Sequence, residues 1–180
     1  MQNTALFNGI NSALGLAQVL GIRNRQYSFD GLHDQASKVV GLTDFGPDYY
    51  QTGMRRLLNS LDQDANLNPY GRLMLEKSMN GALVNRLLLA QLKRQQPEIF
   101  QQPLLPPLIV TGLPRTGTTS LHRLLAADPE HRGVACWELQ SPMPRHSKDT
   151  QEERIKRAEK LFKFAVRSPQ SLMRFIIFVR

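Results

Sequence analysis

The chain has 180 residues, of which 41% are hydrophobic and 21% are charged. These proportions are those of an ordinary globular protein, and they argue against extensive intrinsic disorder. Lysine and arginine outnumber aspartate and glutamate by 23 to 15, so the formal net charge is +8. This excess favours anionic partners such as nucleotides, sulfated polymers, nucleic acids or acidic lipid surfaces, without choosing among them.

Cysteine content and the N-terminal segment bear on the cellular compartment. The single cysteine, Cys136, excludes an internal disulfide and a cysteine cluster for a metal, which fits a reducing compartment. Residues 5–22 are fairly apolar, but Asn8 and Asn11 interrupt them and no basic residue precedes them. We expect an amphipathic helix there, not a signal peptide or a membrane span. The sequence therefore predicts a cytoplasmic protein without a transmembrane segment.

The first hundred residues carry the apolar spacing of helices. Beyond the first amphipathic segment, residues 21–31 are expected to be a linker, and a second helix is expected over residues 48–65. Asn68 and Pro69 are a typical helix cap and first-turn residue. A third helix is therefore predicted to begin there and to end before Pro97.

The sequence pattern changes at the proline-rich segment 103–107, where proline prevents a helix from continuing. The short apolar run 108–110 follows, and its lack of alternation is typical of a strand buried on both faces. A second strand is predicted over residues 133–137. The expected organisation is a helical N-terminal region, residues 1–102, and the start of an α/β domain, residues 103–180.

Helices are also predicted in the second region. One begins at Thr118 and stops at Asp128, where the following proline ends it. Its inward-facing residues are expected to be Leu121, Leu124 and Leu125. A strongly basic helix is predicted over residues 151–166, and residues 172–179 are interpreted as a strand or a helix end. The basic residues are interpreted first as a solvated helix face, and second as a docking surface for nucleic acid, a membrane or an acidic polymer.

The chemistry of the chain lies between the first predicted strand and the helix after it. The eight residues have the glycine spacing G-x-x-x-x-G of a phosphate-binding loop, followed by hydroxyl side chains. They are Gly112, Leu113, Pro114, Arg115, Thr116, Gly117, Thr118 and Thr119. Glycine allows the tight turn, and a helix that begins there presents unpaired N–H groups and its positive dipole end to an anion.

One residue separates this loop from the ATP- and GTP-binding version, in which lysine follows the second glycine. Thr118 occupies that position here, and the positive charge lies within the loop at Arg115. Such a loop suits a terminal phosphate or sulfate better than a triphosphate with magnesium. No acidic strand end suited to a metal is evident, so no metal ligands are predicted.

Residues 107–129 resemble the donor loop of sulfotransferases that use 3′-phosphoadenosine 5′-phosphosulfate (PAPS), in the bacterial-type branch of that family. Weaker similarity reaches upstream to Leu42 and downstream through Trp137, Glu138 and Leu139 to Pro144. The resemblance implies an α/β fold with a P-loop-like, central parallel sheet. It also implies PAPS as co-substrate, no metal, and transfer of a sulfuryl group to a hydroxyl or amine.

The resemblance also implies catalytic roles for two residues. Many family members carry lysine at the position of Arg115, where it is thought to stabilise charge on the leaving oxygen. Arginine keeps the charge but cannot act as an acid, so Arg115 is assigned electrostatic stabilisation. Glu138 is the candidate base for the acceptor, and a structural salt bridge is its alternative interpretation.

The segment that binds the 3′-phosphate of the donor in the family has no evident match here. We therefore expect an N-terminal, truncated and inactive portion of a transferase domain, whose incomplete sheet would favour self-association. The expected acceptor is a small molecule or a glycan, and no specific nucleic acid is expected. Two other functions stay open: a P-loop kinase or nucleoside triphosphatase, and a non-catalytic anion-binding module.

Overall fold

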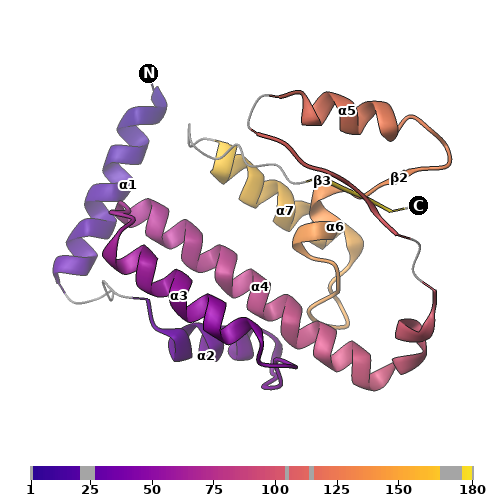
Figure 1. Ribbon diagram of the computed structural model, residues 1–180. Coiled ribbons are helices and arrows are strands. Elements are labelled where there is room, and N and C mark those ends of the chain that lie inside the picture. Colours follow the sequence, from indigo (N-terminus) through magenta and orange to yellow (C-terminus); the bar gives the residue numbers. More distant parts are fainter. Residues whose placement is uncertain (1, 21–26, 104–105, 114–115, 167–175, 180) are drawn as a thin grey trace. The chain divides into compact units, whose positions relative to one another are not determined.

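The computed structural model describes residues 2–20, 27–103, 106–113, 116–166 and 176–179. The chain divides into two compact units, Met1–Gln95 and Gln96–Arg180 (Figure 1).

The first unit is helical. Its helices are α1 (Gln2–Val19), α2 (Phe29–Val40), α3 (Tyr50–Gln63) and α4 (Pro69–Gln95). The long helix α4 packs against α1 and α2, and α2 also contacts α3. The buried apolar side chains of this unit come from α2, α3 and α4, and they are Leu32, Ala36, Leu58, Tyr70, Leu83, Val84, Leu87 and Leu88. Burial of this apolar surface is the main stabilising contribution in the unit.

The predicted third helix is confirmed, with the predicted cap. Pro69 is the first residue of α4, and the side-chain oxygen of Asn68 accepts a hydrogen bond from the N–H of Gly71 at 2.7 Å. Helix α2 was not predicted. Its cap, Ser28, lies in the segment expected to be a linker, and its hydroxyl accepts from the N–H of Gly31 at 3.0 Å. The apolar residues Phe29, Leu32, Ala36 and Val39 of α2 do recur at helical spacing, and together with the Ser28 cap they were a sequence signal for this helix.

A partly buried ion pair joins the start of α4 to α3. The guanidinium of Arg72 contacts Asp62 at 2.6 Å, and both side chains are largely buried. Asp62 also accepts from the N–H of Tyr27, whose hydroxyl donates to the carbonyl of Arg72. These bonds fix the chain just before α2 against α3 and α4.

The second unit mixes short strands and helices. Its elements are the 3₁₀ helix η1 (Pro97–Gln101), β1 (Leu108–Val110), α5 (Thr118–Leu125), β2 (Arg132–Gly133), α6 (Cys136–Gln140), α7 (Gln151–Val166) and β3 (Ile176–Val179). The basic helix predicted over residues 151–166 is confirmed as α7. Helix α5 packs on β1, and α6 packs on α7.

The sheet of the second unit has the strand order β1-β3-β2. Strand β3 is antiparallel to both neighbours, with Leu108 opposite Phe178 and Arg132 opposite Val179. The described strands therefore do not form the predicted parallel sheet. Strands β1 and β2 do run in the same direction and are joined through α5, but β3 lies between them and they share no hydrogen bonds.

Two further expectations for the second unit were wrong. The predicted strand 133–137 is only Arg132–Gly133, because the chain turns at Ala135 into helix α6. The expected burial is also missing: Ile109 of β1 is 60% exposed and Leu124 of α5 is 71% exposed, and Leu121 is exposed as well. An apolar run predicts a strand, but it cannot say what covers that strand.

Among the residues that the structure describes, none of the helices combines the length and the apolarity needed to cross a bilayer.

The packing of α4 makes a direct prediction. Leu87 is completely buried, whereas Leu89, two residues along, is 47% exposed. Leu87→Ala should lower the free energy of unfolding by about 2 to 5 kcal/mol through lost burial and a cavity. Leu89→Ala is the matched control and should change it by less than about 1 kcal/mol. Urea unfolding followed by far-ultraviolet circular dichroism measures both, and equal effects would contradict the assigned core.

Candidate functional site

The candidate phosphate loop connects β1 to α5 through a left-handed turn. Gly117 has φ +86° and ψ 11°, and it directly precedes Thr118, the first residue of α5. A side chain at this position would be strained, because L-residues other than glycine rarely adopt such a φ. The second glycine of the sequence motif is thus required by the backbone that starts the helix.

The first glycine of the motif is required for a different reason. A Cβ atom on Gly112 would lie 2.8 Å from the hydroxyl oxygen of Thr116 and 2.9 Å from the methyl carbon of Thr118. Thr116 is held in place, because its hydroxyl donates to the carbonyl of Leu113 at 2.7 Å and its N–H donates to the same carbonyl at 3.3 Å. The loop therefore folds its threonine side chains against the backbone of Gly112.

The start of α5 offers hydrogen-bond donors. The first bond of the helix runs from the N–H of Leu121 to the carbonyl of Gly117 at 3.0 Å. The N–H groups of the three preceding residues, Thr118 to Ser120, consequently have no acceptor within the helix. Together with the helix dipole, these donors suit a phosphate or sulfate group.

Six of the eight predicted loop residues lie within the described part of the chain: Gly112, Leu113, Thr116, Gly117, Thr118 and Thr119. Pro114 and Arg115 lie outside the described residues, so the role of Arg115 stays a prediction. Thr116 and Gly117 are exposed and Thr118 and Thr119 are half-buried. The loop is thus open to a ligand over most of its described length.

Glu138 lies in the first turn of α6, whereas the strand predicted over residues 133–137 would have placed it directly after a strand. One carboxylate oxygen accepts from the N–H of Ala135 at 2.8 Å, and the other forms an ion pair with the exposed guanidinium of Arg132. Glu138 therefore caps α6 and joins it to β2. This is the salt bridge foreseen as its alternative interpretation, and its catalytic role stays a prediction.

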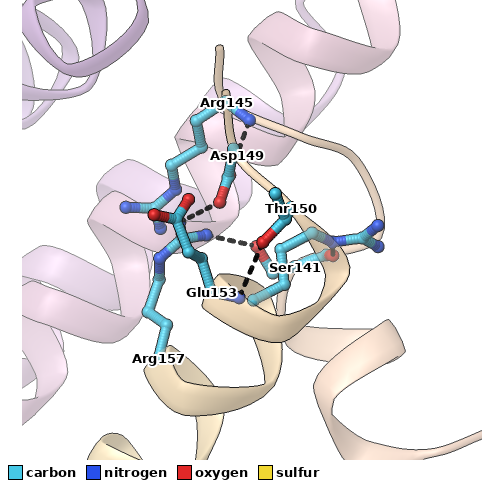
Figure 2. A network of polar contacts seen from close by, with 7 residues as sticks. Ser141, Arg145, Asp149, Thr150, Glu153 and Arg157 are labelled. Carbon is cyan, nitrogen blue, oxygen red and sulfur yellow. Dashed lines mark hydrogen bonds and ion pairs between the residues drawn. The ribbon is translucent and has the colours of Figure 1, made fainter. Parts of the chain in front are cut away.

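A second group of polar side chains, not predicted from the sequence, joins α7 to the loop before it (Figure 2). The carboxylate of Asp149 is fully buried and accepts from the guanidinium of Arg157 at 2.6 Å and from the N–H of Arg145 at 2.8 Å. Arg157 also donates to the hydroxyl of Ser141 at 2.9 Å. Arg154 donates to the carbonyls of Ser141 and Pro142, each at 2.8 Å.

These contacts revise the interpretation of the basic helix. Arg154 and Arg157 are not a solvated face, because they hold the loop after α6 against α7. Arg154 also lies over the ring of Trp137 in α6, 4.8 Å from its centre. A sequence signal existed in Asp149 and Thr150, a typical cap before a helix, but it could not identify arginines one and two turns further on.

Burial raises the pKa of the Asp149 carboxyl, but hydrogen bonds from Arg157 and from the N–H of Arg145 more than offset it. The net pKa lies below the usual range. The pKa of His122 in α5 is lowered, first by burial and then by the charge of Arg123. Among the described residues, no group of three or more His, Cys, Asp or Glu side chains is placed to hold a metal ion.

Comparison with known proteins bears on this loop. A family model described as "Sulfotransferase family" matches residues 106–175, which include the whole loop. Among solved structures, sulfotransferase STF1 from Mycobacterium tuberculosis H37Rv is 38% identical to this chain, with a TM-score of 0.66. The match covers 82% of this chain and 42% of the mycobacterial protein. No curated protein matches the chain significantly.

The fold is therefore that of a sulfotransferase over about two-fifths of the length of the mycobacterial enzyme. The chain belongs to the sulfotransferase family. The family assignment predicted from the loop is confirmed.

The left-handed turn can be tested through stability. Gly117→Ala should lower the free energy of unfolding of the second unit by about 1 to 2 kcal/mol, because alanine is strained at that φ. The single tryptophan, Trp137, reports on this unit by its fluorescence during urea unfolding. Gly53→Ala is the control for glycine replacement in general: it lies within α3 of the first unit, and its added Cβ meets nothing within 4 Å. It should not destabilise the chain when unfolding is followed by far-ultraviolet circular dichroism. An unchanged midpoint for Gly117→Ala would contradict the described turn.

Asp149 predicts a pH dependence. Because its pKa is lower in the folded than in the unfolded chain, its contribution to stability is present above about pH 4 and is lost as the pH falls through the folded-state pKa. Asp149→Asn should cost on the order of 3 kcal/mol at pH 7. Its deficit relative to the parent chain should shrink below pH 4. A deficit that is constant from pH 7 to pH 3, measured by Trp137 fluorescence in urea, would contradict this role.

Proposed function

We propose that the chain forms the donor-binding part of a PAPS-dependent sulfotransferase, with residues 103–180 as the start of its α/β domain. The enzyme would transfer a sulfuryl group to a hydroxyl or amine of a small-molecule or glycan acceptor. The observation that carries this proposal is the geometry of the loop between β1 and α5, within a chain of the sulfotransferase family.

The loop favours a phosphosulfate over a nucleoside triphosphate. It offers the N–H groups at the start of α5 and the hydroxyls of Thr118 and Thr119, which can surround one tetrahedral anion. A nucleoside triphosphate would need lysine directly after Gly117 to reach its outer phosphates, and Thr118 stands there. The 5′-phosphosulfate of PAPS presents its anionic group without that requirement.

Sulfuryl transfer then follows from the roles proposed for this chain's residues. The acceptor oxygen or nitrogen forms a bond to sulfur as the bond from sulfur to the bridging oxygen breaks. Arg115 stabilises the negative charge that develops on that oxygen, and 3′-phosphoadenosine 5′-phosphate leaves. The acceptor's proton passes to the carboxylate of Glu138.

To act as a base, Glu138 needs a carboxylate oxygen that can be released from its present partners. Its carboxylate is engaged by Arg132 and by the N–H of Ala135. Arg132 is 65% exposed, so its ion pair with Glu138 is weakly held and can open when an acceptor arrives. The bond to Ala135 meanwhile keeps the carboxylate at the start of α6.

Calorimetric titration tests the donor. The chain should bind 3′-phosphoadenosine 5′-phosphate more tightly than ATP with magnesium. Gly112→Ala should weaken the preferred binding at least tenfold, because its methyl group displaces Thr116 and Thr118. Arg115→Ala should also weaken it, through loss of a charged donor.

Arg56→Ala is the matched control for removal of one arginine, because Arg56 is exposed on α3 in the first unit. It should bind as the parent chain does. Tighter binding of ATP with magnesium, or equal weakening by Arg56→Ala and Arg115→Ala, would contradict the proposed donor site.

A further inference from the structure

The loop before α7 holds an arginine whose charge is not neutralised. Arg145 contributes its N–H to the buried carboxylate of Asp149 at 2.8 Å, so its backbone is fixed. Within the described residues its guanidinium forms no hydrogen bond or ion pair, and its Nε is buried without a partner. A buried donor left without an acceptor is unfavourable, because it loses its hydrogen bond to water and gains none in return.

A second guanidinium lies close by. Arg157 reaches from α7 to the same carboxylate, and Figure 2 shows Arg145 and Arg157 on one side of Asp149. The pKa of Arg145 is lowered by burial, then by the charge of Arg157, and Asp149 only partly offsets this. Arg157 donates from one terminal nitrogen to Asp149 and from the other to Ser141, whereas Arg145 reaches Asp149 only through its backbone N–H.

The other charged side chains near Arg145 and Arg157 do not neutralise their positive charge. Glu153, in the first turn of α7, is exposed, and its N–H donates to the hydroxyl of Thr150 at 3.3 Å. In the part of the chain that is described, its carboxylate forms no ion pair with either arginine. Lys148 is exposed on the same loop and adds further positive charge. The local excess is therefore cationic.

We propose that Arg145, supported by Arg157, binds the oxyanion of a sulfate or phosphate group at the start of α7. Arginine suits this role because its planar fork can donate two parallel hydrogen bonds to such a group. The guanidinium of Arg145 turns about its side-chain bonds on binding, so that Nε and a terminal nitrogen face the ligand. Asp149 and Ser141 keep Arg157 in place and supply no bond to the ligand.

The site does not depend on the function proposed for the phosphate loop, since it uses none of the loop's residues. The oxyanion could belong to the donor or to an anionic acceptor, and both present the same chemistry to Arg145.

Side-chain NMR of the arginine Nε–H groups tests the site in the full chain. Inorganic phosphate should shift the Arg145 Nε–H resonance saturably, and chloride at equal ionic strength should not. Assignment comes from Arg145→Lys, in which the resonance is missing. No shift, or the same shift with chloride, would overturn the proposal.

Two variants separate a specific site from general charge. Lys148→Leu removes one exposed positive charge from the same loop and should change the phosphate midpoint less than twofold. Glu153→Gln removes an exposed carboxylate from the first turn of α7 and should lower the phosphate concentration at the midpoint of the titration. Loss of phosphate binding in Lys148→Leu would overturn the proposal, as would an Arg145 resonance that responds to Glu153→Gln but not to phosphate.

The source of the oxyanion is read by competition. If 3′-phosphoadenosine 5′-phosphate displaces inorganic phosphate from Arg145, the donor supplies the group. If both bind together, the site serves an anionic acceptor. A chain that binds phosphate at Arg145 but no 3′-phosphoadenosine 5′-phosphate anywhere would support this site while contradicting the proposed donor function.

Discussion

The left-handed backbone of Gly117 is the constraint on which the candidate donor site depends. It directs the chain from the loop into α5, whose first N–H groups have no acceptor within the helix. The same turn places the methyl group of Thr118 where a side chain on residue 112 would lie, so that residue 112 must be glycine. The two glycines of the motif thus act together: one sets the direction of the helix, and the other leaves room for the threonines.

Among the described residues of the second unit, Ala158 is the buried apolar side chain, and charged side chains join several of the elements. Asp149 fixes Arg157, and through it Ser141, while Arg154 binds the carbonyls at the end of α6. Glu138 and Arg132 make a second, more exposed connection between α6 and β2. Several basic residues that give the chain its positive charge therefore have structural partners. This weakens the case for a docking surface for an acidic polymer along α7 and directs attention to Arg145, whose charge has none among the described residues.

The sequence predicted best what depends on local chemistry. The cap formed by Asn68 and Pro69, the extent of α7 and the start of α5 at Thr118 follow from rules that act within one turn of helix. The family assignment rested on the loop and was confirmed. The predicted parallel direction of the strands was wrong, because the pairing of β1 with β3 joins residues about 70 positions apart and no local pattern encodes it. The predicted burial of Leu124 was wrong because burial, too, depends on contacts with residues far away in the sequence.

The site residues also divide into those that local sequence predicts and those that depend on distant partners. The roles of Gly112 and Gly117 follow from backbone geometry that glycine spacing already indicates. The partners of Glu138 and Asp149 could not be predicted, because a carboxylate in a sequence does not reveal which arginine will meet it in space. Arg145 was missed because only the structure shows a guanidinium without a carboxylate of its own.

The central claim is that the start of α5 binds the 5′-phosphosulfate of a PAPS-type donor. Backbone amide NMR of the full chain measures this directly, as the shifts of Gly112 and Thr116 to Ser120 on addition of 3′-phosphoadenosine 5′-phosphate. We predict saturable shifts concentrated in these amides, larger than those caused by ATP with magnesium. Shifts confined to other residues, or a stronger response of the loop to ATP with magnesium, would contradict the account.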